Sequence, residues 1–304
     1  MKRIAFALVA LAGALLAAAP ARALNVFACE PEWASLAAAL GGERVSVYAA
    51  TGGRQDPHRI EARPALIARL RNADLAVCTG AELEIGWLPL LLRQSANRRV
   101  QPGAPGWFVA ADHVELKEIP ARLDRAEGDI HAMGNPHIQT DPRNVALVAR
   151  ALTVRLAEID RANAADYERL GAAFQAKWRA AIARWEAEGA PLKGRAVAVY
   201  HRSWRYLFDW LGIAEAGAIE PKPGVPASSA HLAQLLADMP RRGVRAVVFA
   251  AYQDPRAARF VADKAGVPAI ELPFTVGGND AAKDLFALFD DTLRRLAAGI
   301  GATR

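Results

Sequence analysis

Residues 162–188 read ANAADYERLGAAFQAKWRAAIARWEAE, a run rich in alanine, arginine and glutamate without a strand signal. The region without strand signals begins at Asn144, and it predicts one helix to about Asp160 followed by a long one. A helix of about 25 residues spans nearly 40 Å. Trp178 and Trp185 lie seven residues apart on one face, which is typical of packing. We expect a stiff helical connector with little hinge motion.

Short apolar runs alternate with helical patterns on both sides of this connector. The expected strands are 26–29, 45–50, 75–79, 196–200, 214–219, 246–250 and 269–272. The expected helices are 32–40, 63–72, 84–94, 204–211, 230–239, 255–265 and 280–298. Such alternation indicates βαβ units. The predicted fold class is therefore α/β, with two lobes, each a parallel β-sheet flanked by helices, joined by a long rigid helix.

The N-terminus has the features of a secretory signal peptide. Lys2-Arg3 is basic, residues 4–19 form an apolar run, and Ala21-Arg22-Ala23 is a cleavage site of the A-x-A type. We expect a soluble, exported protein after cleavage near Ala23. The expected divisions are a signal peptide at 1–23, an N-terminal lobe at 24–140, a helical connector at 141–190 and a C-terminal lobe at 191–304.

Charge and size argue against nucleic acid as a partner. Loss of the signal peptide removes three basic residues and no acidic one, so the formal charge falls from +6 to +3. Lysines and arginines are interspersed with acids, which is typical of a solvated surface. Half of the residues are hydrophobic (53%), enough for one large core or two ordinary ones.

Two cysteines occur in the chain, Cys29 and Cys78, each at the end of an apolar run. In an oxidising compartment, such a pair suggests a disulfide. Two small buried thiols are the alternative, because the sequence does not show the geometry. With no C-x-x-C motif, a thiolate zinc site is not expected.

Three histidines and one aspartate occupy loops that should face a cleft. His58 follows the strand at 45–50, and His201 directly follows the strand at 196–200. His137 lies in a proline-stiffened loop before a helix that starts at Asp141-Pro142. Asp280 follows the last strand in a glycine-rich turn, where we expect it to begin the final helix. In open α/β sheets, ligands bind at these strand ends.

Three imidazoles and one carboxylate form a four-coordinate set that suits Zn²⁺. Each residue also has a simpler explanation, because loop histidines are often surface residues and Asp280 alone is a good helix N-cap. The joint placement of all four favours a metal site.

Several motifs resemble a known family over essentially the whole mature length. They are Asp56-Pro-His58, residues 72–84, Gly134-Asn-Pro-His137 with Asp141-Pro142, the strand ending in His201, and Gly277-Gly-Asn-Asp280. The chain is similar to the periplasmic zinc- and manganese-binding proteins of metal ABC importers.

The resemblance implies a metal held in the cleft by His58, His137, His201 and Asp280. A histidine at the third position goes with zinc in that family, whereas manganese members have a glutamate there, so His201 favours Zn²⁺. Manganese or iron is the alternative cargo. The resemblance also implies a periplasmic carrier, not an enzyme, which docks on a membrane permease. We expect a monomer, with a periplasmic metallochaperone as a further candidate partner.

The roles of the neighbouring groups stay open. His131 is either an accessory ligand that hands metal inward or a loop residue, whereas His113 and His231 are expected to be structural or at the surface. Asp56 and Glu61 are the carboxylates nearest to His58 in sequence and are expected to orient its ring.

Two other functions compete with metal transport. A zinc hydrolase would use three histidines and a water, but the sequence contains no H-E-x-x-H helix or nucleophile elbow. A binding protein for iron chelates or haem would need an arginine or aromatic pocket, for which Arg202, Trp204 and Arg205 are candidates.

Overall fold

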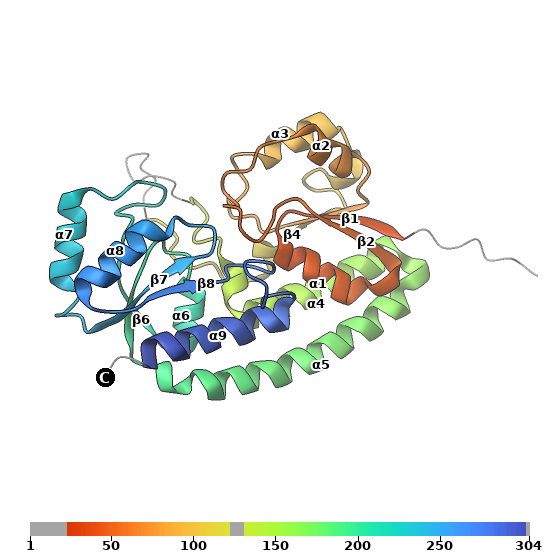
Figure 1. Ribbon diagram of the computed structural model, residues 1–304. Coiled ribbons are helices and arrows are strands. Elements are labelled where there is room, and N and C mark those ends of the chain that lie inside the picture. The colour runs from red at the N-terminus through yellow and green to blue at the C-terminus, as the bar shows by residue number, and fades with distance from the viewer. Residues whose placement is uncertain (1–22, 122–130, 302–304) are drawn as a thin grey trace, which may run out of the picture.

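The computed structural model describes residues 23–121 and 131–301 and shows two α/β lobes side by side (Figure 1). The predicted signal peptide lies outside the described residues except for Ala23, as does most of the segment before His131. Among the residues described, none of the helices is both long and apolar enough to cross a membrane.

The first lobe is built on a parallel sheet with strand order β2-β1-β3-β4. Its strands are β1 (Leu24–Ala28), β2 (Val45–Ala49), β3 (Leu75–Cys78) and β4 (Trp107–Val109). Its helices are α1 (Pro31–Gly41), α2 (Pro64–Arg71) and α3 (Leu88–Ser95). The strand β4 was not predicted, because three residues are too few to show a periodic pattern.

The second lobe repeats this arrangement with strand order β6-β5-β7-β8, again all parallel. Its strands are β5 (Ala196–Val199), β6 (Ala214–Ala218), β7 (Val244–Ala250) and β8 (Ala269–Leu272). Its helices are α6 (Arg205–Leu211), α7 (Ser229–Asp238), α8 (Pro255–Ala265) and α9 (Leu285–Gly301). The predicted α/β fold class is confirmed. In both sheets the first strand in sequence is central, so ligands are expected where its carboxyl end meets the neighbouring loops.

Two helices connect the lobes, α4 (Pro142–Ile159) and α5 (Ala164–Gly189). The 26 residues of α5 correspond to about 39 Å, and Figure 1 shows this helix running under both lobes beside α9. Trp178 and Trp185 are fully buried on it, with ring centroids 5.1 Å apart, and both pack against Phe289 of α9. Their predicted packing role is confirmed.

Short 3-10 turns complete the described chain at Gly42–Arg44, Arg98–Val100, Ala110–His113, Ile138–Thr140, Arg161–Asn163 and Ala190–Leu192.

The largest apolar core extends across both lobes. It contains Val77 of β3, Leu152 of α4, Trp178 of α5 and Val248 of β7 in one cluster. Because the lobes share packed side chains through the connector, moving one against the other would disturb a close-packed interior. This arrangement supports the expected small hinge motion.

Two predicted helix starts are wrong. The helix expected from Glu84 begins at Leu88, because Trp87 directly before it has non-helical backbone angles (φ −141°, ψ −37°). The final helix begins at Leu285 instead of Asp280.

Candidate metal centre

Three histidines from separate loops meet between the lobes. His58 lies between β2 and α2, His137 precedes the turn that leads into α4, and His201 follows β5. One ligand nitrogen from each lies within 4.8 Å of the other two. The ring centroids of His58 and His137 are 5.3 Å apart, those of His137 and His201 5.5 Å, and those of His58 and His201 5.9 Å. The structure thus brings together three of the four predicted ligands.

Carboxylates hold two of the rings in place. Asp56 Oδ1 lies 2.8 Å from His58 Nδ1, and Glu220 Oε2 lies 2.7 Å from His201 Nδ1. Each contact fixes Nδ1 and leaves Nε2 for a metal ion, which is the usual arrangement of ligating histidines. Burial alone would raise the pKa of Asp56, but the hydrogen bonds and charge of His58 outweigh it and the pKa is lowered.

The expected partner Asp56 is therefore in place, whereas Glu61 is exposed. Glu220 was not predicted, although it lies just past β6, the strand that pairs with β5 beside His201. Its position at the end of a strand was the signal that could have revealed it.

His137 is the most deeply buried of the three, with 1% of its surface exposed. Its Nδ1 has no hydrogen-bond partner, and its Nε2 lies 3.4 Å from His201 Nε2. Burial and the neighbouring histidines lower the pKa of His137 well below its usual value, so the ring is neutral. A neutral imidazole is the form that binds metal.

Asn135 ties the loop of His137 to the loop of His201. Its Oδ1 accepts a hydrogen bond from the backbone N–H of His137 at 3.0 Å, and its Nδ2 donates to the carbonyl of Arg202 at 2.9 Å. The amide thus connects two candidate ligands from different lobes.

The separation of the His137 and His201 nitrogens fits a tetrahedral metal site. For Zn–N bonds of about 2.0–2.1 Å, the edge of a tetrahedron is about 3.3–3.4 Å. The 3.4 Å between the Nε2 atoms of His137 and His201 matches this edge. Imidazole ligands suit zinc, copper, iron and nickel, whereas manganese favours oxygen.

The structure does not bring Asp280 to this cluster. Asp280 is exposed, and it is not among the described groups whose ligand atoms lie within 4.8 Å of one another. The side chain of Asn279 folds the loop by accepting from the N–H groups of Ala281 and Ala282, and Asp284 accepts from Ala287 N at the start of α9. The predicted helix-capping position of Asp280 is therefore wrong, because Asp284 accepts the hydrogen bond at the start of α9.

The other three histidines, His131, His113 and His231, are not part of the three-histidine cluster. The ring of His131 lies 5.3 Å from that of His58, at the edge of the cluster. His113 stacks on Phe108 at 4.8 Å, and Nε2 of His231 contacts the carbonyl of Ala218 at 2.9 Å. His113 and His231 thus lie in structural contacts, as expected.

Two cavities flank the cluster, and His201 lines both. One of about 300 Å³ also borders His58 and Glu220, and the other, of about 450 Å³, borders His131 and His137. Of the three groups proposed for a chelate or haem pocket, Trp204 is 2% exposed and Arg205 pairs with Asp209, whereas Arg202 lines the second cavity.

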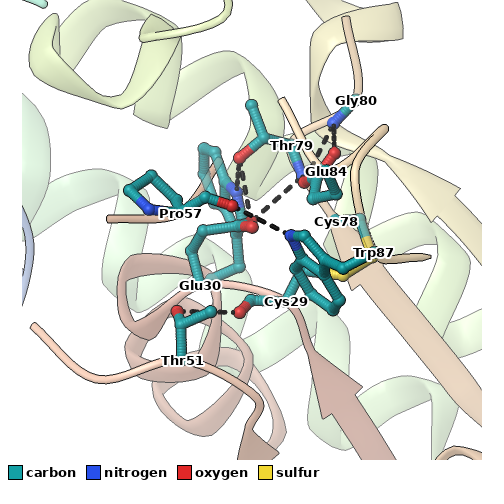
Figure 2. Close-up of a disulfide and its surroundings, with 10 residues drawn as sticks. Cys29, Glu30, Thr51, Pro57, Cys78, Thr79, Gly80, Glu84 and Trp87 are labelled. Carbon is teal, nitrogen blue, oxygen red and sulfur yellow. Dashed lines mark hydrogen bonds between the residues drawn. A yellow bond between two sulfur atoms is a disulfide. The ribbon is translucent and has the colours of Figure 1, made fainter. Parts of the chain in front are cut away.

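A disulfide supports the loop that carries His58. Cys29 and Cys78 are joined where β1 and β3 end side by side (Figure 2). Trp87 belongs to the same buried apolar cluster as both cysteines and donates from Nε1 to the carbonyl of Pro57 at 2.9 Å. The residue before His58 is therefore held by this part of the core.

Two buried carboxyl groups lie beside the disulfide (Figure 2). Glu30 and Glu84 are 2% and 3% exposed, and both accept from the backbone N–H of Thr79, at 3.2 Å and 2.7 Å. Burial raises the pKa of Glu84 to about 7, and burial together with the charges of Glu84 and Glu32 raises the pKa of Glu30. One proton between Glu30 and Glu84 is therefore favoured at neutral pH.

This pair predicts a dependence of stability on pH. The folded state keeps a proton that an unfolded glutamate releases near its ordinary pKa of 4.5, so the free energy of unfolding should fall as pH rises from about 4.5 to about 7. We expect Glu30→Gln to flatten this slope and to stabilise the protein at pH 8 by on the order of 1–2 kcal/mol. Urea unfolding of both proteins at several pH values measures the slope and the stabilisation at pH 8.

The exposed Glu43 provides the matched control, since Glu43→Gln makes the same change outside the core. An unchanged slope in Glu30→Gln would show that the buried pair does not hold the proton.

Comparison with known proteins identifies the family. Residues 26–299 match the family described as zinc-uptake complex component A, periplasmic (ZnuA). The chain belongs to this family. The high-affinity zinc uptake system protein ZnuA of Brucella abortus is 27% identical over 42% of the chain and 38% of the relative. The metal ABC transporter substrate-binding lipoprotein SloC of Streptococcus mutans is 20% identical over 91% of the chain and 90% of the relative.

Solved structures of metal-binding proteins share the fold. A zinc-bound ZnuA deletion mutant is 24% identical, with a TM-score of 0.77 over 93% of this chain and 100% of that one. A manganese-bound periplasmic metal-binding protein of Candidatus Liberibacter asiaticus is 16% identical, with a TM-score of 0.74 over 90% of this chain and 98% of that one. The fold is thus shared with proteins whose structures contain different metals.

Proposed function

We propose that this protein is a periplasmic solute-binding protein that captures Zn²⁺ and delivers it to an ABC-type metal importer. The convergence of His58, His137 and His201 is the observation that carries the proposal. These three side chains are the proposed ligands, and each can present a nitrogen to one ion without rearrangement of the fold.

The donor set favours zinc over manganese. Three imidazoles supply nitrogen, and the carboxylates nearest to them contact Nδ1 atoms of His58 and His201. Manganese prefers oxygen ligands, so a nitrogen-rich set disfavours it. Relatives are named for both metals, including the manganese ABC transporter substrate-binding lipoprotein PsaA of Streptococcus pneumoniae, and Mn²⁺ is the second candidate.

Carriage of metal explains the site better than hydrolysis. A zinc hydrolase needs a free general base beside a metal-bound water. Here Asp56 and Glu220 are each hydrogen-bonded to a histidine. The carboxylates therefore orient ligands instead of activating water.

Delivery requires a partner that opens the site. Because the lobes share one core through α4 and α5, we infer that release follows strain imposed by docking on the membrane permease. We expect a monomeric carrier in the periplasm, after removal of residues 1–23, with a metallochaperone as a further candidate partner.

Metal content and competition test the proposal. We expect the processed full-length protein, purified from a periplasm, to contain one zinc ion per chain. After the metal is stripped, calorimetric competition should show Zn²⁺ binding at least about 100-fold more tightly than Mn²⁺. Equal or tighter binding of Mn²⁺ would favour the manganese assignment, and a lack of stoichiometric metal would refute the carrier function.

A further inference from the structure

A fourth histidine faces the cluster with an unused nitrogen. Nε2 of His131 is buried and has no hydrogen-bond partner. Its ring centroid lies 5.3 Å from that of His58 and 6.4 Å from that of His137. The first of these distances equals the spacing between His58 and His137. A buried polar atom without a partner is costly, so its position calls for an explanation.

The segment after His131 is attached to the first lobe by a strained loop. Ala132 N donates to Glu82 Oε2 at 2.5 Å. Ala81 and Glu82 both have positive φ angles, 48° and 65°, which cost residues other than glycine on the order of 1 kcal/mol or more each. Such strain persists where the surrounding structure enforces it. Here the strained backbone places the Glu82 carboxylate against the backbone N–H next to His131.

The same segment is fixed at its other end. Gly134 N donates to the carbonyl of His131 at 3.0 Å, and Asn135 N donates to the carbonyl of Lys117 at 2.7 Å. Gly134 has φ 115°, and a Cβ there would approach Lys117 O to 2.7 Å. The loop that leads from His131 to His137 is therefore closed by hydrogen bonds at both ends.

We propose that His131 is the fourth ligand of the metal ion, which makes the site a set of four imidazoles. This inference rests on the proposed function and assigns to His131 the ligand position that the family resemblance implies for Asp280. Among the described residues, His131 belongs to no group of three ligand atoms that lie within 4.8 Å of one another, so binding requires a shift of its ring toward the ion.

Charge balance is consistent with four neutral ligands. An ion held by four imidazoles keeps its full +2 charge, which a buried site must compensate. Asp56 and Glu220 are hydrogen-bonded to the rings of His58 and His201, and they supply two negative charges directly behind these ligands. A carboxylate is therefore not needed as the fourth ligand. A tetrahedral set made only of nitrogen ligands favours Zn²⁺ over Mn²⁺.

X-ray absorption at the zinc edge tests the coordination directly. We expect four imidazole nitrogens around zinc in the unaltered protein, and three with one oxygen in His131→Ala. The same variant should bind Zn²⁺ at least about tenfold more weakly in a competition titration. Met133→Ala is the matched control, because Met133 is 50% exposed on the same loop, and its affinity should be unchanged.

The outcomes separate this inference from the proposed function. Three imidazoles in the unaltered protein, or unchanged equilibrium affinity in His131→Ala with only slower capture, would overturn the fourth ligand while the carrier function stands. Failure of the unaltered protein to bind zinc would overturn both. Circular dichroism of His131→Ala confirms that any loss of binding occurs in folded protein.

Discussion

Replacing His201 with alanine is expected to weaken Zn²⁺ binding by more than about 100-fold. Loss of an outer partner of a metal ligand already costs about 10–100-fold, and His201 is itself a central proposed ligand. The change also leaves Glu220 without its 2.7 Å contact to the ring, so a half-buried carboxylate loses a partner. Competition with a chelator of known affinity measures the effect.

His231→Ala is the matched control for this experiment. It removes the same side chain from the same lobe, but its ring contacts the carbonyl of Ala218 and is not part of the histidine cluster. Affinity should stay within about twofold of the unaltered protein, since surface changes away from a site have small effects. Comparable losses in both variants, or none in His201→Ala, would refute the assignment of His201.

Removal of the disulfide is expected to lower the free energy of unfolding by about 4 kcal/mol. The bond closes a loop across a sequence separation of 49, and the chain-entropy relation gives about this value at 25 °C. The double change Cys29→Ala with Cys78→Ala avoids new buried polar groups. Chemical denaturation of oxidised protein against the double variant measures the difference.

A reductant provides the internal control. It should lower the unfolding midpoint of the unaltered protein toward that of the double variant, and it should have no effect on the variant itself. If the reductant shifts neither, the bond contributes nothing to stability, and the loop-closure argument fails.

Much of the fold follows from local sequence. Strands such as β3 and β7 are buried along nearly their whole length, so they appear as continuous apolar runs. Helix α8 begins at Pro255 after the capping residue Asp254, as its start signal predicted. Interactions between near neighbours determine these features.

Features that depend on pairing between distant segments do not follow from the local sequence. The register of β1 against β3 pairs Ala28 with Val77, which brings the next residues, Cys29 and Cys78, together. Sequence could not show this register. Asp280 and Asp284 both resemble helix caps, and only the folded loop places the helix start after Asp284.

The sequence by itself determined the α/β class, the helical connector and the identity of three histidines that converge, because these depend on local periodicity and on strand-end loops. The tertiary structure decided which groups surround them. Glu220 reaches His201 through the pairing of β6 with β5, and His131 faces the cluster because Glu82 of another loop holds its neighbour. These contacts join residues far apart in the chain, and their geometry exists only once both lobes are packed on the connector.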